Sequence, residues 1–91
     1  MIITVVKHDD VLGDLTGNVD VKTFGQLMKV DRSITGLDTI AYAKLLGVSR
    51  QTIYNTESGQ TEFDKLKMAG FAALRGYDVN GVLEAFYKEE S

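Results

Sequence analysis

The chain has 91 residues, a formal net charge of −3, and neither cysteine nor proline. This length allows one small domain with a modest core, which is marginally stable alone and gains from a partner subunit. The absence of cysteine excludes a disulfide framework and a thiolate zinc site, and no apolar run approaches the roughly 20 residues that a membrane-spanning helix needs.

Negative charge is concentrated at the beginning of the chain. Residues 1–20 carry four aspartates against one lysine, whereas residues 21–91 carry nine basic and nine acidic side chains. Because affinity for nucleic acid comes mostly from Lys and Arg, the acidic total argues mildly against DNA binding. The neutral remainder is compatible with DNA binding if its cations face one way.

The first segment, MIITVVK, is short and rich in β-branched residues, which predicts a strand over Ile2–Val6. An isolated strand leaves backbone groups unpaired. We therefore expect this strand either to pair with its copy in a second subunit or to fold back over its own domain. Residues 1–19 form this arm, residues 20–87 the main domain and residues 88–91 a solvated tail.

The strand is expected to break at His8, Asp9 and Asp10, and glycine and asparagine then mark turns through an irregular stretch. These three side chains also have the chemistry of a metal or acid–base site, but one histidine without a second cluster favours a polar turn. No serine–histidine–aspartate set, phosphate-binding glycine loop or pair of catalytic carboxylates is evident, so the sequence does not indicate an enzyme.

Five short helices are predicted after this stretch from capping residues and glycine stops. Their expected caps and ends are Asp20 to near Ser33, Asp38 to Gly47, Ser49 to Ser58, a capping box at Thr61–Asp64 to Gly76, and Asp78 onward. Apolar residues at helical spacing predict the core positions Val21, Phe24, Leu27, Met28, Phe63, Leu66, Met68, Phe71, Leu74, Val79, Val82, Leu83 and Phe86. Gly70 is expected to mark a close helix contact. The predicted fold class is mainly α, with a short N-terminal strand.

The segment Leu37–Gln60 is the most informative part of the chain. It predicts two short helices around a tight turn at Gly47, where glycine allows the positive φ that such a turn requires. Ala43 is small where the helices must approach closely, and Val48 and Ile53 are expected to pin the second helix to the core. The polar side of that second helix then faces outward.

The outward side chains of the second helix are those of Arg50, Gln51, Tyr54 and Asn55. Arginine, asparagine and glutamine have the donor geometry that fits guanine and adenine edges in the major groove. Tyr54 suits a contact with a sugar or a thymine methyl group, or a dimer seam. The hydroxyl side chains suited to phosphate oxygens are those of Ser49, Thr52 and Ser58. A solvated helix face is the simpler interpretation of these residues alone, but the turn before them favours DNA contact.

Over roughly residues 20–87 the chain resembles the Cro/phage-repressor helix-turn-helix family, also called the xenobiotic-response-element family. The matching segments are FGQLMK near Phe24, GLDT at Gly36–Thr39, A-x-x-L-G-V-S-R-Q-T-I from Ala43 to Ile53, ESG at Glu57–Gly59, and LRGYDVNGVLEAF. The resemblance implies a five-helix, lambda-repressor-like domain that binds DNA as a dimer. Its half-sites would lie about one helical turn, roughly 34 Å, apart.

By position, the resemblance implies that bases face Arg50, Gln51 and Asn55, with Tyr54 beside them. It implies that phosphates are contacted by Thr39, Ser49, Thr52 and Ser58, and that the core holds Ala43, Leu46, Val48 and Ile53.

Four positions depart from the family pattern. Thr39 stands where glutamine is common. Thr56 stands where an apolar residue is usual, so the end of the helix that begins at Ser49, the third of the five, is expected to pack less firmly. Ile40 and Leu45 replace residues that are normally charged and exposed. We expect the N-terminal arm, the leader of residues 1–19, or a second subunit to cover these two apolar side chains.

These observations predict a sequence-specific, dimeric DNA-binding regulator, a repressor of phage, plasmid or mobile-element type. It would act in the cytoplasm of a bacterial or phage-infected cell by occupying duplex DNA at an operator, with no cofactor. Phe86 and Tyr87 are either the last core turn or part of a subunit interface. One alternative is an antitoxin whose leader holds a toxin. The other is a helix-turn-helix fold used only for protein–protein interaction, which the neutral charge and the apolar Ile40 and Leu45 favour.

Overall fold

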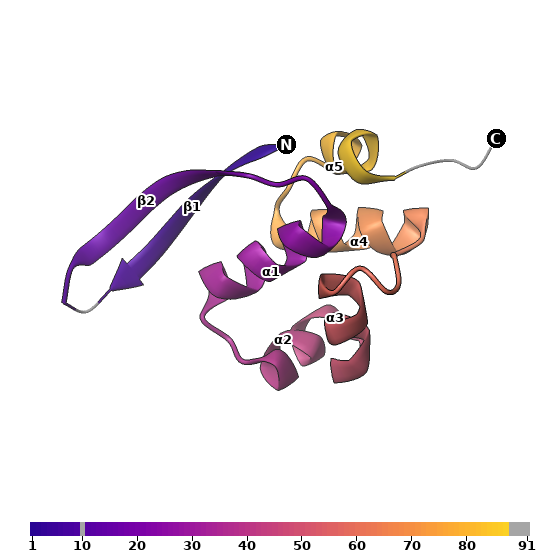
Figure 1. The fold of residues 1–91 in the computed structure, drawn as a ribbon, viewed down its shortest axis with the longest axis horizontal. Coiled ribbons are helices and arrows are strands. Elements are labelled where there is room, and N and C mark those ends of the chain that lie inside the picture. The colour runs from indigo at the N-terminus through magenta and orange to yellow at the C-terminus, as the bar shows by residue number, and fades with distance from the viewer. Residues whose placement is uncertain (10, 88–91) are drawn as a thin grey trace.

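The computed structural model describes residues 1–9 and 11–87, apart from the side chains of residues 7–9, 14 and 15. The strands are β1 (Ile2–Asp9) and β2 (Gly13–Asp20), and the helices are α1 (Phe24–Thr35), α2 (Thr39–Leu46), α3 (Arg50–Glu57), α4 (Lys65–Arg75) and α5 (Val79–Phe86). The described residues confirm the expectation of a mainly helical chain with five helices. Figure 1 shows these helices packed together, with the two strands projecting from one side.

The N-terminal arm is a two-stranded antiparallel ribbon, in which Ile2 pairs with Asp20 and Asp9 pairs with Gly13. The predicted strand therefore continues through the backbone of His8 and Asp9, and the expected irregular stretch is wrong because it forms β2. Its sequence, GDLTGNVD, holds residue types with low strand propensity, and pairing with β1 outweighs that preference. Asp10, the side chains of His8 and Asp9, and the predicted tail at residues 88–91 lie outside the described residues.

The base of the ribbon packs against the helices. Ile3 is buried in the core, Val5 and Val19 pack beside it, and β1 contacts α1. The leader thus folds back on its own domain, but it does not cover Ile40 and Leu45, which stay 51% and 39% exposed. The expectation that the leader covers those two side chains is wrong, because the ribbon reaches α1 and not α2.

The first helix begins later than predicted. Its N-cap is Thr23, whose hydroxyl accepts a hydrogen bond from the backbone N–H of Gln26. Asp20, the predicted cap, is instead the last residue of β2, because pairing with Ile2 extends the strand to that point. Val21 is buried in the link between β2 and α1.

Three other caps match the predictions. Asp38, Ser49 and Asp78 each accept a hydrogen bond from the backbone N–H three residues later, at the starts of α2, α3 and α5. α2 ends at Gly47 with φ of 72°, the left-handed conformation that glycine adopts without steric cost. Short-range capping rules therefore define the helix–turn–helix segment of the fold.

The start of α4 differs from the predicted capping box. Asp64, not Thr61, is the N-cap, and its side chain accepts from the N–H of Lys67. Phe63 and Met68, which flank this cap, are both buried in the core, the arrangement of a hydrophobic staple. Two predicted core positions are wrong: Leu66 is 82% and Leu74 is 54% exposed, because both lie on the outer side of α4.

An aromatic cluster forms the centre of the core. The ring of Phe24 lies 5.1 Å from those of Phe63 and Phe71 and 6.2 Å from that of Phe86, centroid to centroid. These rings join α1, α4 and α5, so Phe86 belongs to the last core turn, as one of its two interpretations predicted. The remaining buried apolar residues outside the ribbon are Val21, Leu27, Met28, Tyr42, Ala43, Ile53, Met68, Ala72 and Val82.

A glycine allows a close helix crossing, but it is not the glycine that was expected. A β-carbon at Gly25 in α1 would collide with the carbonyl oxygen of Thr56 in α3, so these two helices meet backbone to backbone. Nothing lies within 4 Å of a β-carbon built at Gly70. The predicted helix contact at Gly70 is therefore wrong.

Candidate nucleic-acid interface

The candidate site is the unit formed by α2, the turn at Gly47 and α3. The N–H of Val48 donates to the carbonyl of Ala43 at 3.0 Å, which closes the end of α2. α3 begins two residues later, capped by the hydroxyl of Ser49, which accepts from the N–H of Thr52 at 3.1 Å. Only three residues separate the two helices, so their relative direction is set by the backbone of this turn.

The inner side of this unit is fixed to the core. Ile53 is fully buried, Ala43 is 4% exposed, and Leu46 and Val48 pack partly buried against them. These four residues therefore lie where the core was predicted. Thr56 is also buried, at 2% exposure, and its Oγ1 has no hydrogen-bond partner among the described residues. The end of α3 is thus inside the fold but holds an unsatisfied hydroxyl, which costs free energy.

The outer side of α3 carries the four predicted base-contacting residues. Arg50, Gln51 and Tyr54 are exposed and Asn55 is half-buried, and their i, i+1, i+4 and i+5 spacing places them along one side of the helix. The Gln51 Nε2 donates to the Asn55 Oδ1 at 2.9 Å, which aligns the two amides. In the described part of the chain the Arg50 guanidinium has no ion-pair or hydrogen-bond partner.

Charge on this side of α3 is positive because its one acidic residue points inward. Glu57, whose side chain is 10% exposed, accepts from Arg32 of α1 at 2.9 Å. This pair joins α3 to α1 and neutralises the carboxylate. Arg50 is then the one charged side chain on the outward side of the helix.

The four predicted phosphate-contacting residues differ in their exposure and in the hydrogen bonds that their hydroxyls make. Ser49 and Ser58 are exposed, whereas Thr39 and Thr52 are half-buried. The hydroxyls of Ser49 and Thr52 lie 2.8 Å apart and share one hydrogen bond. Ser58 donates to the carbonyl of Asn55 at 3.1 Å. Several of these hydroxyls therefore act as local caps, and an external acceptor would have to replace those contacts.

A shallow pocket of about 200 Å³ lies between the first turns of α2 and α3 and was not predicted from the sequence. Its lining consists of Asp38, Thr39, Ile40, Arg50 and Tyr54. Ile40 and Tyr54 are each 51% exposed. The sequence signal that could have located it is the unexpectedly apolar Ile40 near the N-terminus of a short helix whose partner begins with arginine.

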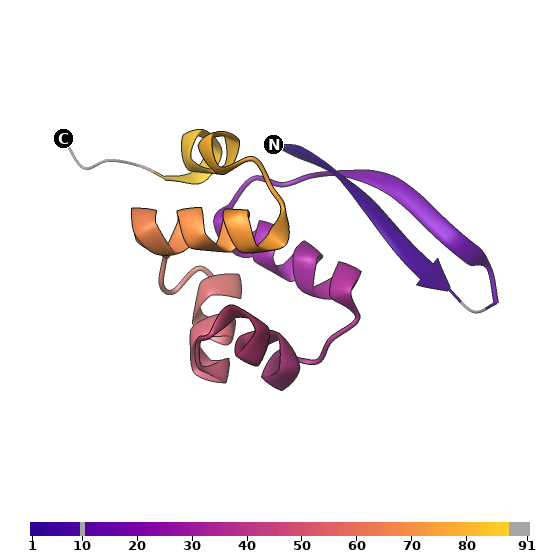
Figure 2. The ribbon, with the colours of Figure 1, turned by 180° about the vertical axis from the view of Figure 1, so that it is seen from behind.

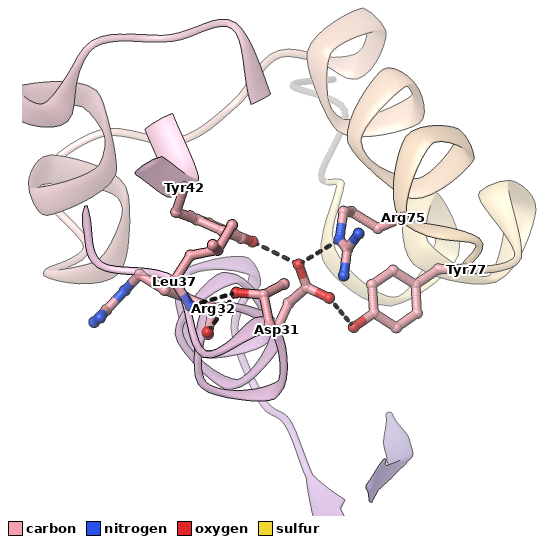
Figure 3. A network of polar contacts seen from close by, with 7 residues as sticks. Asp31, Arg32, Leu37, Tyr42, Arg75 and Tyr77 are labelled. Atoms are coloured by element: carbon pink, nitrogen blue, oxygen red, sulfur yellow. Dashed lines mark hydrogen bonds and ion pairs between the residues drawn. The ribbon is translucent and has the colours of Figure 1, made fainter. Parts of the chain in front are cut away.

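A buried carboxylate holds α2 in place from behind, and it too was missed. The Asp31 Oδ2 of α1 accepts from the Tyr42 hydroxyl at 2.7 Å and from the Arg75 Nε at 2.8 Å, while its Oδ1 accepts from the Tyr77 hydroxyl at 2.7 Å. Figure 3 shows these donors converging on the carboxylate from different helices and from the link before α5. Asp31 is 2% exposed, so the pairing compensates for a charge removed from water.

The surroundings of the Asp31 carboxylate also raise the pKa values of its hydrogen-bond donors. Burial, followed by the hydrogen bond to Asp31, raises the pKa of Tyr42 above its ordinary value of 10.0, and the same causes raise the pKa of Tyr77. The hydrogen bond to Asp31 raises the pKa of Arg75. Both phenols therefore stay protonated and donate at neutral pH. The network spans sequence separations of 11 to 46 residues, which no local pattern reveals.

Other kinds of site have little support in the described residues. Among them, no group of three or more His, Cys, Asp and Glu side chains could hold a metal ion. No helix in the described part of the chain is long and apolar enough to cross a membrane. Comparison with known proteins found no matching family model, no similar curated protein and no similar solved structure.

Proposed function

We propose that the chain is a sequence-specific, duplex-DNA-binding regulator that uses α2 and α3 as a helix-turn-helix of the Cro/phage-repressor type. The observation that carries this proposal is the outward side of α3. Arg50, Gln51 and Asn55, the side chain types that read base edges, stand on a helix whose opposite side is fixed in the core by Ile53. The free guanidinium of Arg50 is available to guanine.

The proposed mode of action follows from the helix unit. α3 would enter the major groove while the N-terminal turn of α2 lies near the sugar–phosphate backbone. Thr39, Ser49, Thr52 and Ser58 would meet phosphates. The chain would act as a dimeric, cytoplasmic repressor of phage, plasmid or mobile-element type that occupies its operator without a cofactor, and its low charge would make binding modest and salt-dependent.

A second candidate function is protein–protein interaction. It is favoured by large apolar side chains that the described residues leave exposed on the helices, at Ile40, Leu45, Leu66 and Leu74. The projecting ribbon fits the antitoxin version, in which one chain binds both DNA and a toxin. A pure interaction module would have no affinity for duplex DNA at any salt concentration.

The test is selection of bound duplexes from a random pool at low salt, followed by binding measurements on the selected site. Arg50→Ala should weaken binding to that site by about 1–3 kcal/mol and lower its preference over scrambled DNA. The matched control is Lys29→Ala, which removes an exposed cation of α1 next to the base of the ribbon. It should change specific and scrambled binding equally and only slightly.

Two results would count against the proposal. Failure to enrich any duplex, at low or moderate salt, would exclude DNA binding and favour the interaction module. Enrichment of a site that Arg50→Ala binds as tightly as wild type would place the DNA-binding surface elsewhere.

A further inference from the structure

The shallow pocket between α2 and α3 combines features that a phosphate site would not have. Its wall contains the exposed apolar side chain of Ile40 and the ring of Tyr54. At its rim, the Asp38 carboxylate caps α2 by accepting from the N–H of Ala41 at 2.8 Å. A carboxylate next to apolar carbon disfavours an anion, so the wall formed by Ile40 and Tyr54 differs in chemistry from the Thr39 hydroxyl of the same pocket, which is proposed to face a phosphate.

The pocket is nevertheless continuous with the proposed reading side of α3, because Arg50 and Tyr54 belong to both. The apolar group that a base pair presents in the major groove is the methyl at C5 of a pyrimidine, as in thymine. A methyl group in contact with Ile40 and Tyr54 would cover apolar surface that is now exposed to water.

We propose that Ile40 and Tyr54 form a binding notch for the C5-methyl group of a pyrimidine, beside the guanine that Arg50 reads. This proposal rests on the proposed function and deepens it. It makes Ile40 a specificity-determining residue and explains why an apolar side chain stands exposed on the first turn of α2. The methyl group has two sources in DNA, thymine and 5-methylcytosine.

The experiment uses the duplex selected from the random pool. Each thymine is replaced singly by deoxyuridine, which removes the methyl group and leaves base pairing unchanged. In a second arm, each cytosine is replaced by 5-methylcytosine. At one position, loss of the thymine methyl should weaken wild-type binding about fourfold, equivalent to about 0.8 kcal/mol. If cytosine occupies the notch instead, methylation should strengthen binding by a similar factor.

The variant that tests the notch is Ile40→Ser. Because Ile40 is 51% exposed, this change should leave the melting temperature nearly unaltered while abolishing the methyl effect. Leu74→Ser, an equally exposed leucine at 54% outside the pocket, should retain the full methyl effect.

The outcomes separate this proposal from the broader one. If no duplex is enriched, DNA binding itself fails. If a duplex is enriched but every deoxyuridine and 5-methylcytosine duplex binds like the parent, the methyl notch alone is overturned. A methyl effect that persists in Ile40→Ser also overturns it, because the group would then contact other residues.

Discussion

Asp31 shows how one buried charge can fix the direction of several elements. Its two oxygens accept three hydrogen bonds, from α2, from the end of α4 and from the link before α5. If any one of these donors turned to water, the buried carboxylate would lose one of its three hydrogen bonds in the interior. The carboxylate therefore penalises any movement of α2 relative to α4, and it supports the candidate DNA-binding unit from its inner side through Tyr42 of α2.

Asp31→Asn should lower the free energy of unfolding by about 3 kcal/mol, because the substitution removes the charge that Arg75 pairs with and disturbs both phenol hydrogen bonds. Urea unfolding followed by circular dichroism measures the change. The control is Tyr77→Phe, which removes a single hydrogen bond and should cost about 1 kcal/mol. If Asp31→Asn is as stable as wild type, the network does not hold the helices together.

At the scale of elements, the crossing of α1 and α3 depends on the missing side chain at Gly25. Gly25→Ala should destabilise the fold by about 1–3 kcal/mol, because the new β-carbon would push against the backbone of Thr56 and separate the helices. Thermal unfolding of the two proteins measures the effect. Since α3 carries the proposed reading side chains, binding to the selected duplex should weaken as well.

Gly70→Ala is the matched control on a helix of similar length. Its β-carbon has nothing within 4 Å, and alanine favours the helix over glycine, so this variant should gain about 1 kcal/mol. Equal effects of the two substitutions, in either direction, would show that helix propensity decides both and that the α1–α3 contact is loose.

Elements that depend on short-range contacts could be predicted from the sequence, whereas elements that depend on distant contacts could not. The starts of α2, α3 and α5 were predictable because each depends on one side chain and the N–H three residues later. β2 was not predictable in the same way. Its residues favour turns, and only the register with β1, from Ile2–Asp20 to Asp9–Gly13, makes them a strand. Non-local pairing is invisible to a local pattern.

The candidate site likewise has one part that the sequence predicts and one part that depends on distant contacts. The outward positions of Arg50, Gln51 and Tyr54 follow from the helical period and from the buried Ile53. The apolar Ile40 was a signal in the sequence, but the shape of the pocket beside it also depends on the angle between two helices. That angle follows from the turn at Gly47 and from contacts that the chain makes far away in sequence.

At the scale of the whole molecule, the ribbon makes the protein elongated, with a longest extent of 49 Å against 26 and 21 Å. Figure 2, from behind, also shows its outer half extending beyond the helices. Ile3 anchors the base in the core, whereas Val6 is 53% exposed. A two-stranded ribbon is marginal in water unless more strands or a helix cover it, so we predict that a second copy pairs with its outer half.

A shortened ribbon tests this prediction. Thr4 and Asn18 are paired neighbours, so residues 5–17 can be replaced by the dipeptide asparagine–glycine, which favours a two-residue hairpin turn. The variant keeps Ile3 and Val19 on the helices and should melt within a few degrees of the full chain. Sedimentation equilibrium should show a dimer for the full chain and a monomer for the variant.

DNA binding supplies an independent measurement of the same change. The shortened chain should bind a single half-site as wild type does but lose the added affinity for a two-fold site, because that gain depends on linking two reading helices. The half-site reference is needed because the deletion also removes three aspartates and one lysine and so alters electrostatic attraction to DNA.

A variant that remains a dimer would place the interface on the helices, where Leu66 and Leu74 are the exposed apolar residues of α4. A full chain that is a monomer at concentrations where it binds two-fold sites would contradict pairing in solution, and DNA alone would then bring the two copies together.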